Sequence, residues 1–414
     1  MTTMDSRIKL LKFVALFAFG GTERQVVNLA LNLNPDRFDL SFGCLRRSGQ
    51  FLPPLEERGF PVHEYPMRRF LSVRGAMREL QFARHLARER VDIVHAYNFY
   101  ANVFALPAAR LAGVPVVMAA IRDEGAYLTE RQIVAQKHAC RFAHVVTCNA
   151  ESIKRWLTRT GYDPAKIVVI PNGVDTARFA DLRPRPAIRR ELDIPDESPV
   201  VALLARLIPK KGIDHFVEAA IELHGRWPEA RFLIVGAGLP VSGGATPEEA
   251  GFVDRLKARV RLCGLERRII FTGFRDDIPD ILSTIDISVL PSLSEGLSNS
   301  VLESMAAGKA TISTDVGGIA EAMQDGVSGL LIPPASVPAI VRAVERLLAD
   351  RELTARLGAE ARRLVFERYS IPRMVESTER LYAQLLAQRA AQPGWRHPLR
   401  QIPRVFEETG GRES

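Results

Sequence analysis

Strand-like and helix-like segments alternate along the whole chain, and this alternation constrains the fold more than any other feature. Short runs rich in valine, isoleucine and alanine are separated by longer segments whose apolar residues recur with helical spacing. A helix between two strands returns the chain to the same edge of the sheet, so the sequence predicts α/β architecture with parallel sheets. The predicted strands are 13–19, 38–44, 91–95, 114–119 and 145–148 in the first half and 200–205, 232–235, 269–272, 285–290, 310–313 and 329–332 in the second.

The alternation of strand-like and helix-like segments is interrupted near the middle of the chain and then resumes. Pro171-Asn-Gly-Val-Asp175 is typical of a turn, and a charged, proline-rich connector follows it at 181–186. A chain of 414 residues is too long for one ordinary core. We therefore predict two doubly wound domains, 1–180 and 181–369, with a ligand cleft between them at the carboxyl ends of the strands. The polar segment 388–414 holds three prolines and lacks periodicity, which predicts a loosely ordered tail.

The composition is that of an ordinary globular protein, with 47% hydrophobic and 25% charged residues. The four cysteines show neither a CxxC pair nor a metal-binding spacing with histidine, so we expect reduced, buried thiols and a cytoplasmic location. The run 13–19 follows three basic residues and has some features of a secretion signal. A first strand entering the turn at Gly20 and Gly21 explains the same residues, and we prefer that interpretation. No run approaches the ~18 apolar residues of a membrane span.

The net charge of +8 is concentrated in the first half of the chain. Residues 1–180 hold 25 lysines and arginines against 16 aspartates and glutamates. Segment Arg68–Arg90 alone holds seven arginines and two glutamates, with Ala76, Leu80, Ala83 and Ala87 at helical spacing. Two interpretations stay open: a basic amphipathic helix that docks on anionic lipid at the inner face of the plasma membrane, or an ordinary solvated helix face. Nucleic-acid binding is not expected, because no basic-aromatic recognition motif is present.

Two glutamates separated by seven residues mark the candidate site of the second half. Glu295 follows a predicted buried strand, and Glu303 lies in the helix that begins next. The amides of Gly296, Leu297 and Ser298 lie at the start of that helix, where backbone donors and the macrodipole favour an anion. A carboxylate beside such a site can accept hydrogen bonds from hydroxyl groups. Nucleotide sugars, which are polyhydroxylated phosphate esters, satisfy both demands.

The run from Pro291 to Glu321 resembles the signature of the retaining, GT-B-fold glycosyltransferases of family 4, also called glycosyltransferases group 1. That family carries a Glu-x7-Glu motif at this position and a Gly-Gly turn shortly after it. The resemblance covers roughly residues 10–387 and implies two Rossmann-like domains, the first for the acceptor and the second for the donor. It also implies that a helix over 370–387 crosses back to the first domain.

The same resemblance implies the reaction. A sugar would pass from a nucleoside-diphosphate sugar, with UDP or GDP as the carrier, to a glycan or lipid-linked acceptor with retention of anomeric configuration. The departing diphosphate would act as the base, and no cofactor would be needed. Bacterial surface polysaccharide or glycolipid biosynthesis is the implied setting.

Individual roles follow from the resemblance, residue by residue. Glu295 would orient the transferred sugar and Glu303 would bind the ribose. The turn at 272–275 would contact the base, largely through its backbone. The residues implied for the donor diphosphate are Gly20, Gly21, Arg206, Lys211, Gly296, Leu297 and Ser298, and those implied for the base are Phe274 and Arg275. Lys210 could replace Lys211, and the sequence does not separate them.

The first domain departs from the family pattern at one place. Many members carry His-x-His at the end of the third predicted strand, with the second histidine at the reaction centre, whereas this chain has His95 and Tyr97. We keep both as candidate catalytic residues, although a histidine at a strand end is more often a packed residue. Arg122 and Asp123, at another strand end, are candidate acceptor contacts.

Several other chemistries are disfavoured or left open. No Asp-x-Asp pair occurs, so we expect cationic side chains rather than a metal to face the diphosphate. The glycines at 236 and 238 lack the third glycine of a dinucleotide fingerprint, and Pro240 falls where a helix should begin. The long segment 236–251 could be functional or disordered. A nucleotide-sugar 2-epimerase of the same architecture and a non-catalytic sugar-nucleotide binding protein remain as alternatives.

Overall fold

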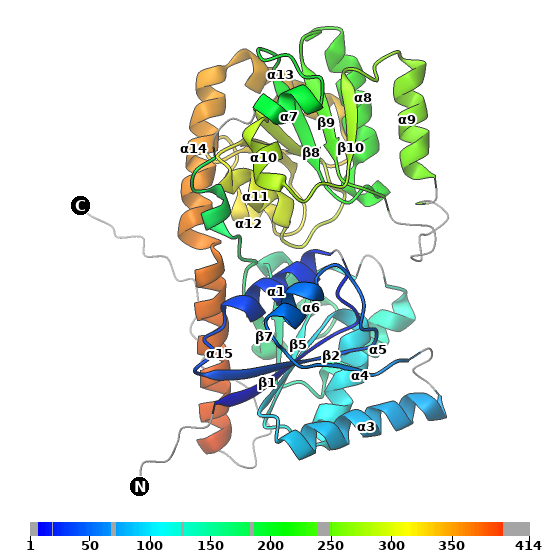
Figure 1. Cartoon of the computed structure of the whole chain (residues 1–414), viewed down its shortest axis with the longest axis vertical. Helices are drawn as coiled ribbons and strands as arrows, with labels where there is room; N and C mark the ends of the chain where they lie inside the picture. The colour runs from blue at the N-terminus through cyan, green and yellow to red at the C-terminus, as the bar shows by residue number, and fades with distance from the viewer. Residues whose placement is uncertain are drawn as a thin grey trace, which may run out of the picture. The chain divides into compact units, whose positions relative to one another are not determined.

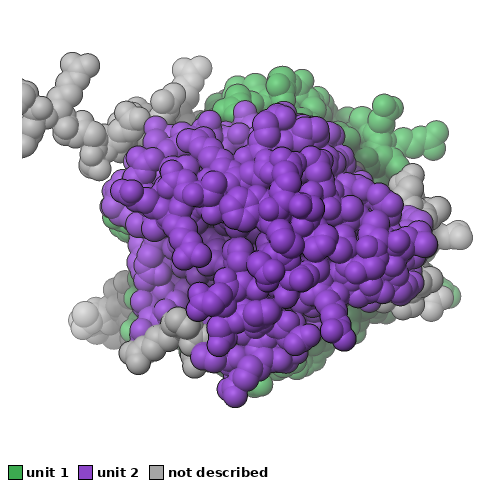
Figure 2. All heavy atoms as spheres, turned by 90° about the horizontal axis from the view of Figure 1, so that it is seen from above, with its two compact units in different colours: residues 1–173, 371–414 green, residues 174–370 purple. Residues whose placement is uncertain are grey.

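The computed structural model describes residues 7–18, 20–67, 72–125, 128–182, 186–238, 249 and 251–391 (Figure 1). Arg68, Arg69, most of the segment 236–251 and the chain beyond Ala391 lie outside these residues. Two compact units are formed, coloured separately in Figure 2. The first comprises 1–173 with 371–414, and the second comprises 174–370, against the predicted domain ranges 1–180 and 181–369.

The first unit is built on a seven-stranded parallel sheet of order β3-β2-β1-β4-β5-β6-β7. The chain first adds β2 and β3 on one side of β1 and then adds β4 to β7 on its other side, so the strand order reverses between β1 and β4. Loops diverge at such a point and leave room for ligands at the carboxyl edge of the sheet. The strands are β1 (Ile8–Val14), β2 (Phe38–Cys44), β3 (Val62–Glu64), β4 (Ile93–Tyr97), β5 (Val116–Ala120), β6 (Val145–Cys148) and β7 (Ile167–Val169).

Helices cover both faces of this sheet. Leu10 and Leu11 are neighbours in β1 but belong to different apolar clusters, because successive strand residues point to opposite faces. The helices are α1 (Gly21–Asn32), α2 (Pro53–Glu57), α3 (Val73–Glu89), α4 (Asn98–Leu111), α5 (Glu130–Cys140), α6 (Glu151–Arg159) and α15 (Ile371–Ala391), with a short 3₁₀ turn η1 (Pro164–Lys166). Helix α15 packs on the first unit through residues that include Met374, Tyr382 and Leu385.

The first predicted strand was placed wrongly. It is not 13–19 but Ile8–Val14, so Lys9 and Lys12 lie inside the strand rather than before it. Lys12 is fully buried and pairs in register with His95 of β4. A lysine inside a buried strand interrupts the apolar run from which a strand is predicted, and this displaced the prediction toward the C-terminus.

The second unit repeats the design with a six-stranded parallel sheet of order β10-β9-β8-β11-β12-β13. Its order reverses between β8 and β11, so the loops after these strands flank the expected ligand position. All six strands were predicted from the sequence within a few residues. They are β8 (Val200–Leu204), β9 (Arg231–Val235), β10 (Ile269–Gly273), β11 (Ile287–Leu290), β12 (Ala310–Thr314) and β13 (Leu330–Ile332).

Eight α-helices accompany the described part of this second sheet. They are α7 (Pro186–Glu191), α8 (Ile213–His224), α9 (Phe252–Leu262), α10 (Ile278–Ser283), α11 (Asn299–Ala306), α12 (Ile319–Ala322), α13 (Val337–Ala349) and α14 (Arg351–Arg368), with 3₁₀ turns η2 (Thr176–Phe179) and η3 (Pro209–Lys211). Val201 and Ala202 are neighbours in β8 and belong to separate apolar clusters, so this sheet is also buried on both faces.

Three further predictions from the sequence can be compared with the structure. Helix α15 continues to Ala391, beyond the predicted end at 387. The cysteines form no disulfide; Cys44, Cys140 and Cys148 are buried as expected, whereas Cys263 is half-buried. Within the described chain, no helix combines the length and apolar character needed to cross a bilayer.

Candidate functional site

Glu295 is held in a defined position at the carboxyl edge of the second sheet. It lies in the loop after β11, and its Oε1 accepts hydrogen bonds from Lys211 Nζ at 2.5 Å and from Ser292 Oγ at 2.7 Å. Its side chain is only 8% exposed, so it is not a solvated loop charge. Lys211 comes from the loop after β8, the strand on the other side of the switch point. The two loops that flank this point therefore meet through a carboxylate and an ammonium.

Backbone contacts fix the loop that carries Lys211. Gly212 has a φ of 66°, and a Cβ there would lie 2.1 Å from the carbonyl oxygen of Pro291. Leu293 N donates to Lys210 O at 2.8 Å, which joins the same two loops again. Only glycine permits this approach, because any side chain would collide with the β11 loop. It is Lys211, rather than the alternative Lys210, that forms the ion pair with Glu295.

A third loop supports Glu295 from behind. The Gly-Gly turn after β12 contributes Gly318 N, which donates to Gly296 O at 2.7 Å. Gly317 has a φ of 59°, and a Cβ there would lie 1.9 Å from Glu295 O. Thr314 Oγ1 donates to Ser292 O at 2.6 Å, so β12 also fixes the residue that binds the carboxylate. The Gly-Gly turn was recognisable in the sequence without a role, whereas the contributions of Ser292 and Thr314 were not predicted.

The start of α11 is where the sequence predicted an anion-binding site, and that role stays a prediction. Ser298 is the residue before the first turn, and its hydroxyl does not cap the helix but lies 3.2 Å from Ser300 Oγ. The backbone amides and the macrodipole at a helix N-terminus favour an anion. Glu303 lies on the same helix and is buried, with 9% exposure. The predicted diphosphate and ribose contacts thus belong to one short loop-helix segment.

The two cationic side chains in the loop after β8 differ in whether they are paired with a carboxylate. Arg206, in the loop after β8, is exposed, and its guanidinium has no hydrogen bond or ion pair with any residue that the structure describes. Lys211 is neutralised by Glu295. Of the two predicted diphosphate ligands in this loop, Arg206 is therefore the one whose charge is uncompensated in the ligand-free protein.

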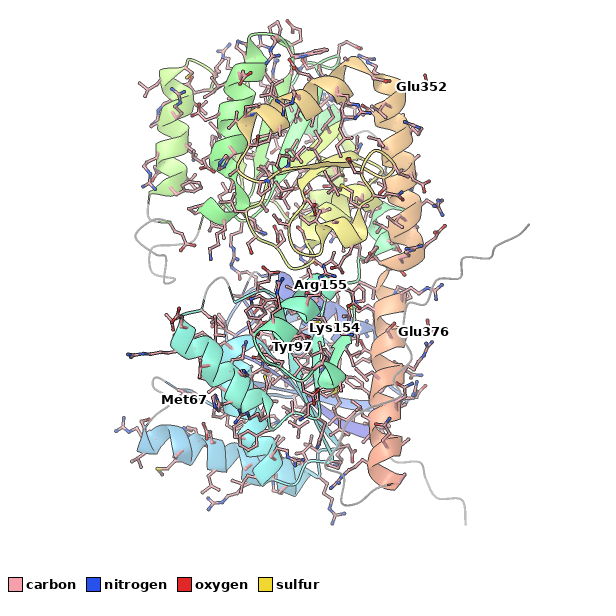
Figure 3. The ribbon with its side chains drawn as sticks, turned by 180° about the vertical axis from the view of Figure 1, so that it is seen from behind. Met67, Tyr97, Lys154, Arg155, Glu352 and Glu376 are labelled. Carbon is pink, nitrogen blue, oxygen red and sulfur yellow. The ribbon has the colours of Figure 1, made fainter. Side chains whose placement is uncertain are left out.

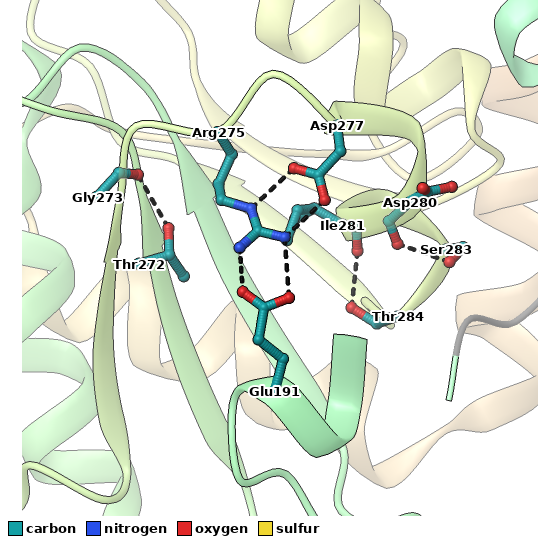
Figure 4. A network of polar contacts seen from close by, with 9 residues as sticks. All are labelled: Glu191, Thr272, Gly273, Arg275, Asp277, Asp280, Ile281, Ser283 and Thr284. Carbon is teal, nitrogen blue, oxygen red and sulfur yellow. Dashed lines mark hydrogen bonds and ion pairs between the residues drawn. The ribbon is translucent and has the colours of Figure 1, made fainter. Parts of the chain in front are cut away.

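In the predicted base-binding turn, the guanidinium of Arg275 is held by two carboxylates (Figure 4). Arg275 donates from Nε to Asp277 Oδ1 at 2.8 Å and from Nη2 to Asp277 Oδ2 at 2.6 Å, and it also forms an ion pair with Glu191 of α7. Hydrogen bonds to these carboxylates raise the pKa of Arg275 above its ordinary value. Because the guanidinium is engaged on both sides, Phe274, which is 52% exposed, has more surface to offer a base than Arg275 has.

In the first unit, the loops after β1 and β4 meet at the other switch point. Gly20 is the residue before α1, and the Glu23 carboxylate lies close to it, since a Cβ on Gly20 would be 2.2 Å from Glu23 Oε2. Asn98 begins α4 with a φ of 63° and donates from Nδ2 to Thr22 Oγ1 at 3.1 Å. Gly20 and Gly21 therefore lie where the sequence predicted a phosphate-binding turn, and that role stays a prediction.

His95 and Tyr97 lie inside the first unit rather than at its surface; Figure 3 shows Tyr97 among the side chains of that unit. His95 Nδ1 lies 2.9 Å from Tyr382 Oη and 3.1 Å from Tyr97 Oη, and its Nε2 lies 3.2 Å from Thr147 Oγ1. Lys12 Nζ donates to both tyrosine hydroxyls, at 2.8 and 3.3 Å. This buried network joins β1, β4 and β6 to α15. A catalytic role for His95 or Tyr97 stays a prediction.

The two candidate acceptor residues are also tied to their own unit. Arg122 Nη1 donates to Asn172 Oδ1 at 2.7 Å, and burial lowers the pKa of its guanidinium. Asp123 Oδ1 accepts from Gly125 N at 2.8 Å. Both follow β5 at the carboxyl edge of the first sheet, as predicted, but the structure does not test whether they contact an acceptor.

Burial and, to a smaller degree, the charge of Arg122 lower the pKa of Lys12 well below 10.5. Between the folded and unfolded pKa values the unfolded chain binds the extra proton, so stability rises with pH up to about 10.5. We expect Lys12→Met to raise the free energy of unfolding, most at the low end of this pH range, because methionine carries no ammonium to bury. Urea unfolding from pH 6 to pH 10 should show the gain shrinking as pH rises.

The matched control is Lys9→Met, which removes a lysine of the same strand whose Nζ donates to Glu89 O. It reports the effect of losing any lysine from β1. A Lys12→Met protein that is less stable than wild type throughout this pH range would contradict the expected cost of the buried ammonium.

Two family models match the two units of the chain in succession. The model described as Glycosyltransferase Family 4 matches residues 19–178, and the one described as Glycosyl transferases group 1 matches residues 184–364. Their junction falls close to the boundary between the two structural units.

Curated relatives and a solved structure extend the match. A UDP-Gal:alpha-D-GlcNAc-diphosphoundecaprenol alpha-1,3-galactosyltransferase from Escherichia coli is 27% identical, over 93% of this chain and 99% of its own. An alpha-D-kanosaminyltransferase from Streptomyces kanamyceticus is 29% identical, over 74% of this chain and 81% of its own. Anabaena HepE, solved with UDP and glucose, superposes with a TM-score of 0.80 at 21% identity, covering 91% of this chain and 100% of its own, which shows the shared fold. Relatives with these names do not favour the 2-epimerase alternative.

Proposed function

The chain belongs to the group 1 glycosyltransferases, and we propose that it transfers a sugar from a UDP-sugar to a lipid-linked acceptor with retention of anomeric configuration. The observation that carries the donor side is the ion pair of Glu295 with Lys211 in the loops at the carboxyl edge of the sheet, just before the N-terminus of α11. A carboxylate that can accept sugar hydroxyls lies there next to donors for a diphosphate.

Donor binding would change the partners of Lys211. In the ligand-free protein its ammonium is paired with Glu295, and Arg206 has no partner among the described residues. An arriving diphosphate carries more negative charge than one carboxylate and attracts both cations. Once Lys211 turns toward the phosphate, Glu295 is free to accept a hydroxyl of the transferred sugar. Glu303, on the same helix, would accept from the ribose.

The reaction then needs no protein nucleophile. As the bond to the anomeric carbon breaks, negative charge builds on the diphosphate, where Arg206, Lys211 and the amides of α11 stabilise it. An oxygen of the departing diphosphate takes the proton of the acceptor hydroxyl, which attacks from the same face. Attack from that face retains the configuration.

Support for UDP and for a lipid acceptor comes from the relative that matches over nearly its whole length. Its name gives UDP-galactose as donor and a diphosphoundecaprenol-linked sugar as acceptor. An acceptor of this kind is held in a membrane, so we also propose that the protein works at the inner membrane surface. A mycobacterial relative is named as GDP-mannose-dependent, and GDP-sugars are therefore the second donor class to test.

The test is a product assay with UDP- and GDP-sugars and a diphospholipid-linked N-acetylglucosamine acceptor. We expect release of one nucleoside diphosphate for each glycosylated acceptor, and an α-linked product from an α-linked donor by NMR. A C2 epimer without glycoside would indicate an epimerase. Binding without turnover or slow hydrolysis would indicate a sugar-nucleotide binding protein, and an inverted product would refute retention.

We expect activity to persist in excess EDTA. The physical reason is that Arg206, Lys211 and the α11 amides can offset the charge of the diphosphate. Among the described residues, no three histidine, cysteine or acidic side chains are grouped so as to hold a metal ion. Initial rates with and without EDTA decide the matter, and full loss that Mg²⁺ or Mn²⁺ restores would overturn this expectation.

A further inference from the structure

Helix α3 has two apolar faces, of which only one is used in the fold. Gly75, Phe82, Ala83 and Leu86 are buried. Phe82 anchors this inner face, with its ring centroid 5.0 Å from that of Phe13 in β1. The sequence placed Ala76, Leu80, Ala83 and Ala87 at helical spacing, with Met77 and Phe82 adding apolar surface. In the structure Phe82 and Ala83 pack inward, whereas the other four are exposed.

The second apolar face points away from the core. Val73, Met77 and Leu80 are 79%, 65% and 40% exposed, and their spacing of four and three residues puts them in line on one side of the helix. We call these three residues the outer stripe of α3. In Figure 1 the helix lies at the outside of the first unit, next to α4. Three large apolar side chains in line on an exposed helix are typical of an interaction surface.

The charges around the outer stripe specify its partner. Arg74, Arg78 and Arg84 are exposed, and none of them pairs with a carboxylate among the described residues. Of the two acidic residues of the helix, Glu79 is half-buried, and Glu89 pairs with Arg88 at 2.9 Å. An apolar stripe flanked by arginines fits a surface that is negative at its boundary and apolar beneath it.

We propose that α3 docks on anionic lipid bilayers, with the outer stripe at the boundary between headgroups and acyl chains and the flanking arginines on lipid phosphates. The inference rests on the proposed function only for the purpose of the docking, which is to bring the enzyme to a lipid-linked acceptor. Because α3 follows β3 in a parallel crossover, it begins near the carboxyl edge of the sheet, and the outer stripe occupies this first half of the helix.

The test is sedimentation of the full-length protein with vesicles of phosphatidylcholine alone or mixed with phosphatidylglycerol, without substrate. We expect binding to the anionic vesicles, release by 0.5 M NaCl, and little binding to neutral ones. The triple variant R74Q/R78Q/R84Q should weaken partitioning by about a hundredfold. Met77→Ser with Leu80→Ser should weaken it by about tenfold even at low salt, because the stripe contributes through apolar burial.

Matched controls come from the second unit. Leu262→Ser removes an apolar side chain that is 85% exposed on α9, and R342Q/R356Q removes exposed helix arginines. Both controls should bind vesicles as wild type does. All α3 variants should keep wild-type turnover on a detergent-solubilised acceptor, which separates loss of docking from loss of the proposed activity. Equal partitioning to neutral and anionic vesicles, no binding at all, or unchanged binding of both α3 variants would overturn the proposal, and the last two would favour a protein partner.

Discussion

Glu295→Ala is expected to lower kcat by about a hundredfold to a thousandfold, which is the range found when a preorganised polar group is removed from a reaction centre. In the ligand-free protein Ser292 and Lys211 hold the carboxylate at 2.7 and 2.5 Å, so its position is set before substrate arrives. A group that is already oriented needs no reorganisation as positive charge develops at the anomeric carbon. Its loss therefore acts on the transition state more than on the bound donor.

Donor affinity should respond in an unusual way. Without Glu295, Lys211 loses its carboxylate partner and is available for the diphosphate. We expect the dissociation constant of the donor to stay level or to fall, while kcat drops. A residue that merely supported the fold would weaken binding and turnover together.

Glu303→Ala is the matched comparison, because it removes the same group from the same loop-helix segment. Its proposed contact with the ribose is remote from bond breaking and similar in ground and transition states, so its loss should mainly raise the donor KM. A hydrogen bond to a charged group contributes about 1.5–3 kcal/mol, which corresponds to roughly a tenfold to 150-fold change.

Measuring kcat, KM and donor dissociation constants for both variants separates the two roles. Near-wild-type kcat in a folded Glu295→Ala protein would refute its place at the reaction centre. A Glu303→Ala protein with a normal KM would remove the ribose assignment.

The second sheet and the position of Glu295 after β11 were predictable because their signals are local. Buried parallel strands appear as largely apolar runs: β8 and β13 consist wholly of apolar residues, although β12 holds three hydroxyl residues. The position of Glu295 follows from a strand, a loop and a helix that are adjacent in sequence. Ser292 was within reach of the same reasoning, since a serine at the end of a strand beside an acidic loop can bind the carboxylate.

Contacts between parts of the chain that are distant in sequence could not be predicted. Lys12 could be placed inside β1 only with knowledge of its partner Tyr382, which lies 370 residues away on α15. The same helix closes over His95, so the sequence could not show that this histidine is buried. Strand β3 (Val62–Glu64) has one apolar residue among three, so it lacks the apolar run that marked the equally short edge strand β13.

Gly317→Ala is expected to lower kcat/KM by about a hundredfold, although the residue contacts no substrate. A Cβ at this position would lie 1.9 Å from Glu295 O and 2.7 Å from its carbonyl carbon. Backbone atoms cannot move aside as a flexible side chain can, so the Glu295 loop must shift. A displacement of about 1 Å at a reaction centre costs roughly a hundredfold in rate.

The matched control separates this clash from the cost of the backbone conformation. Gly326 has a φ of 71°, close to the 59° of Gly317, but a Cβ there would meet nothing within 4 Å. Gly326→Ala should therefore lose only the roughly 1–2 kcal/mol of stability that a left-handed residue with a Cβ costs, and it should keep its activity. Steady-state rates per folded molecule, with thermal unfolding measured alongside, compare the two. Equal loss of activity in both variants, or full activity in Gly317→Ala, would show that the turn after β12 does not position Glu295.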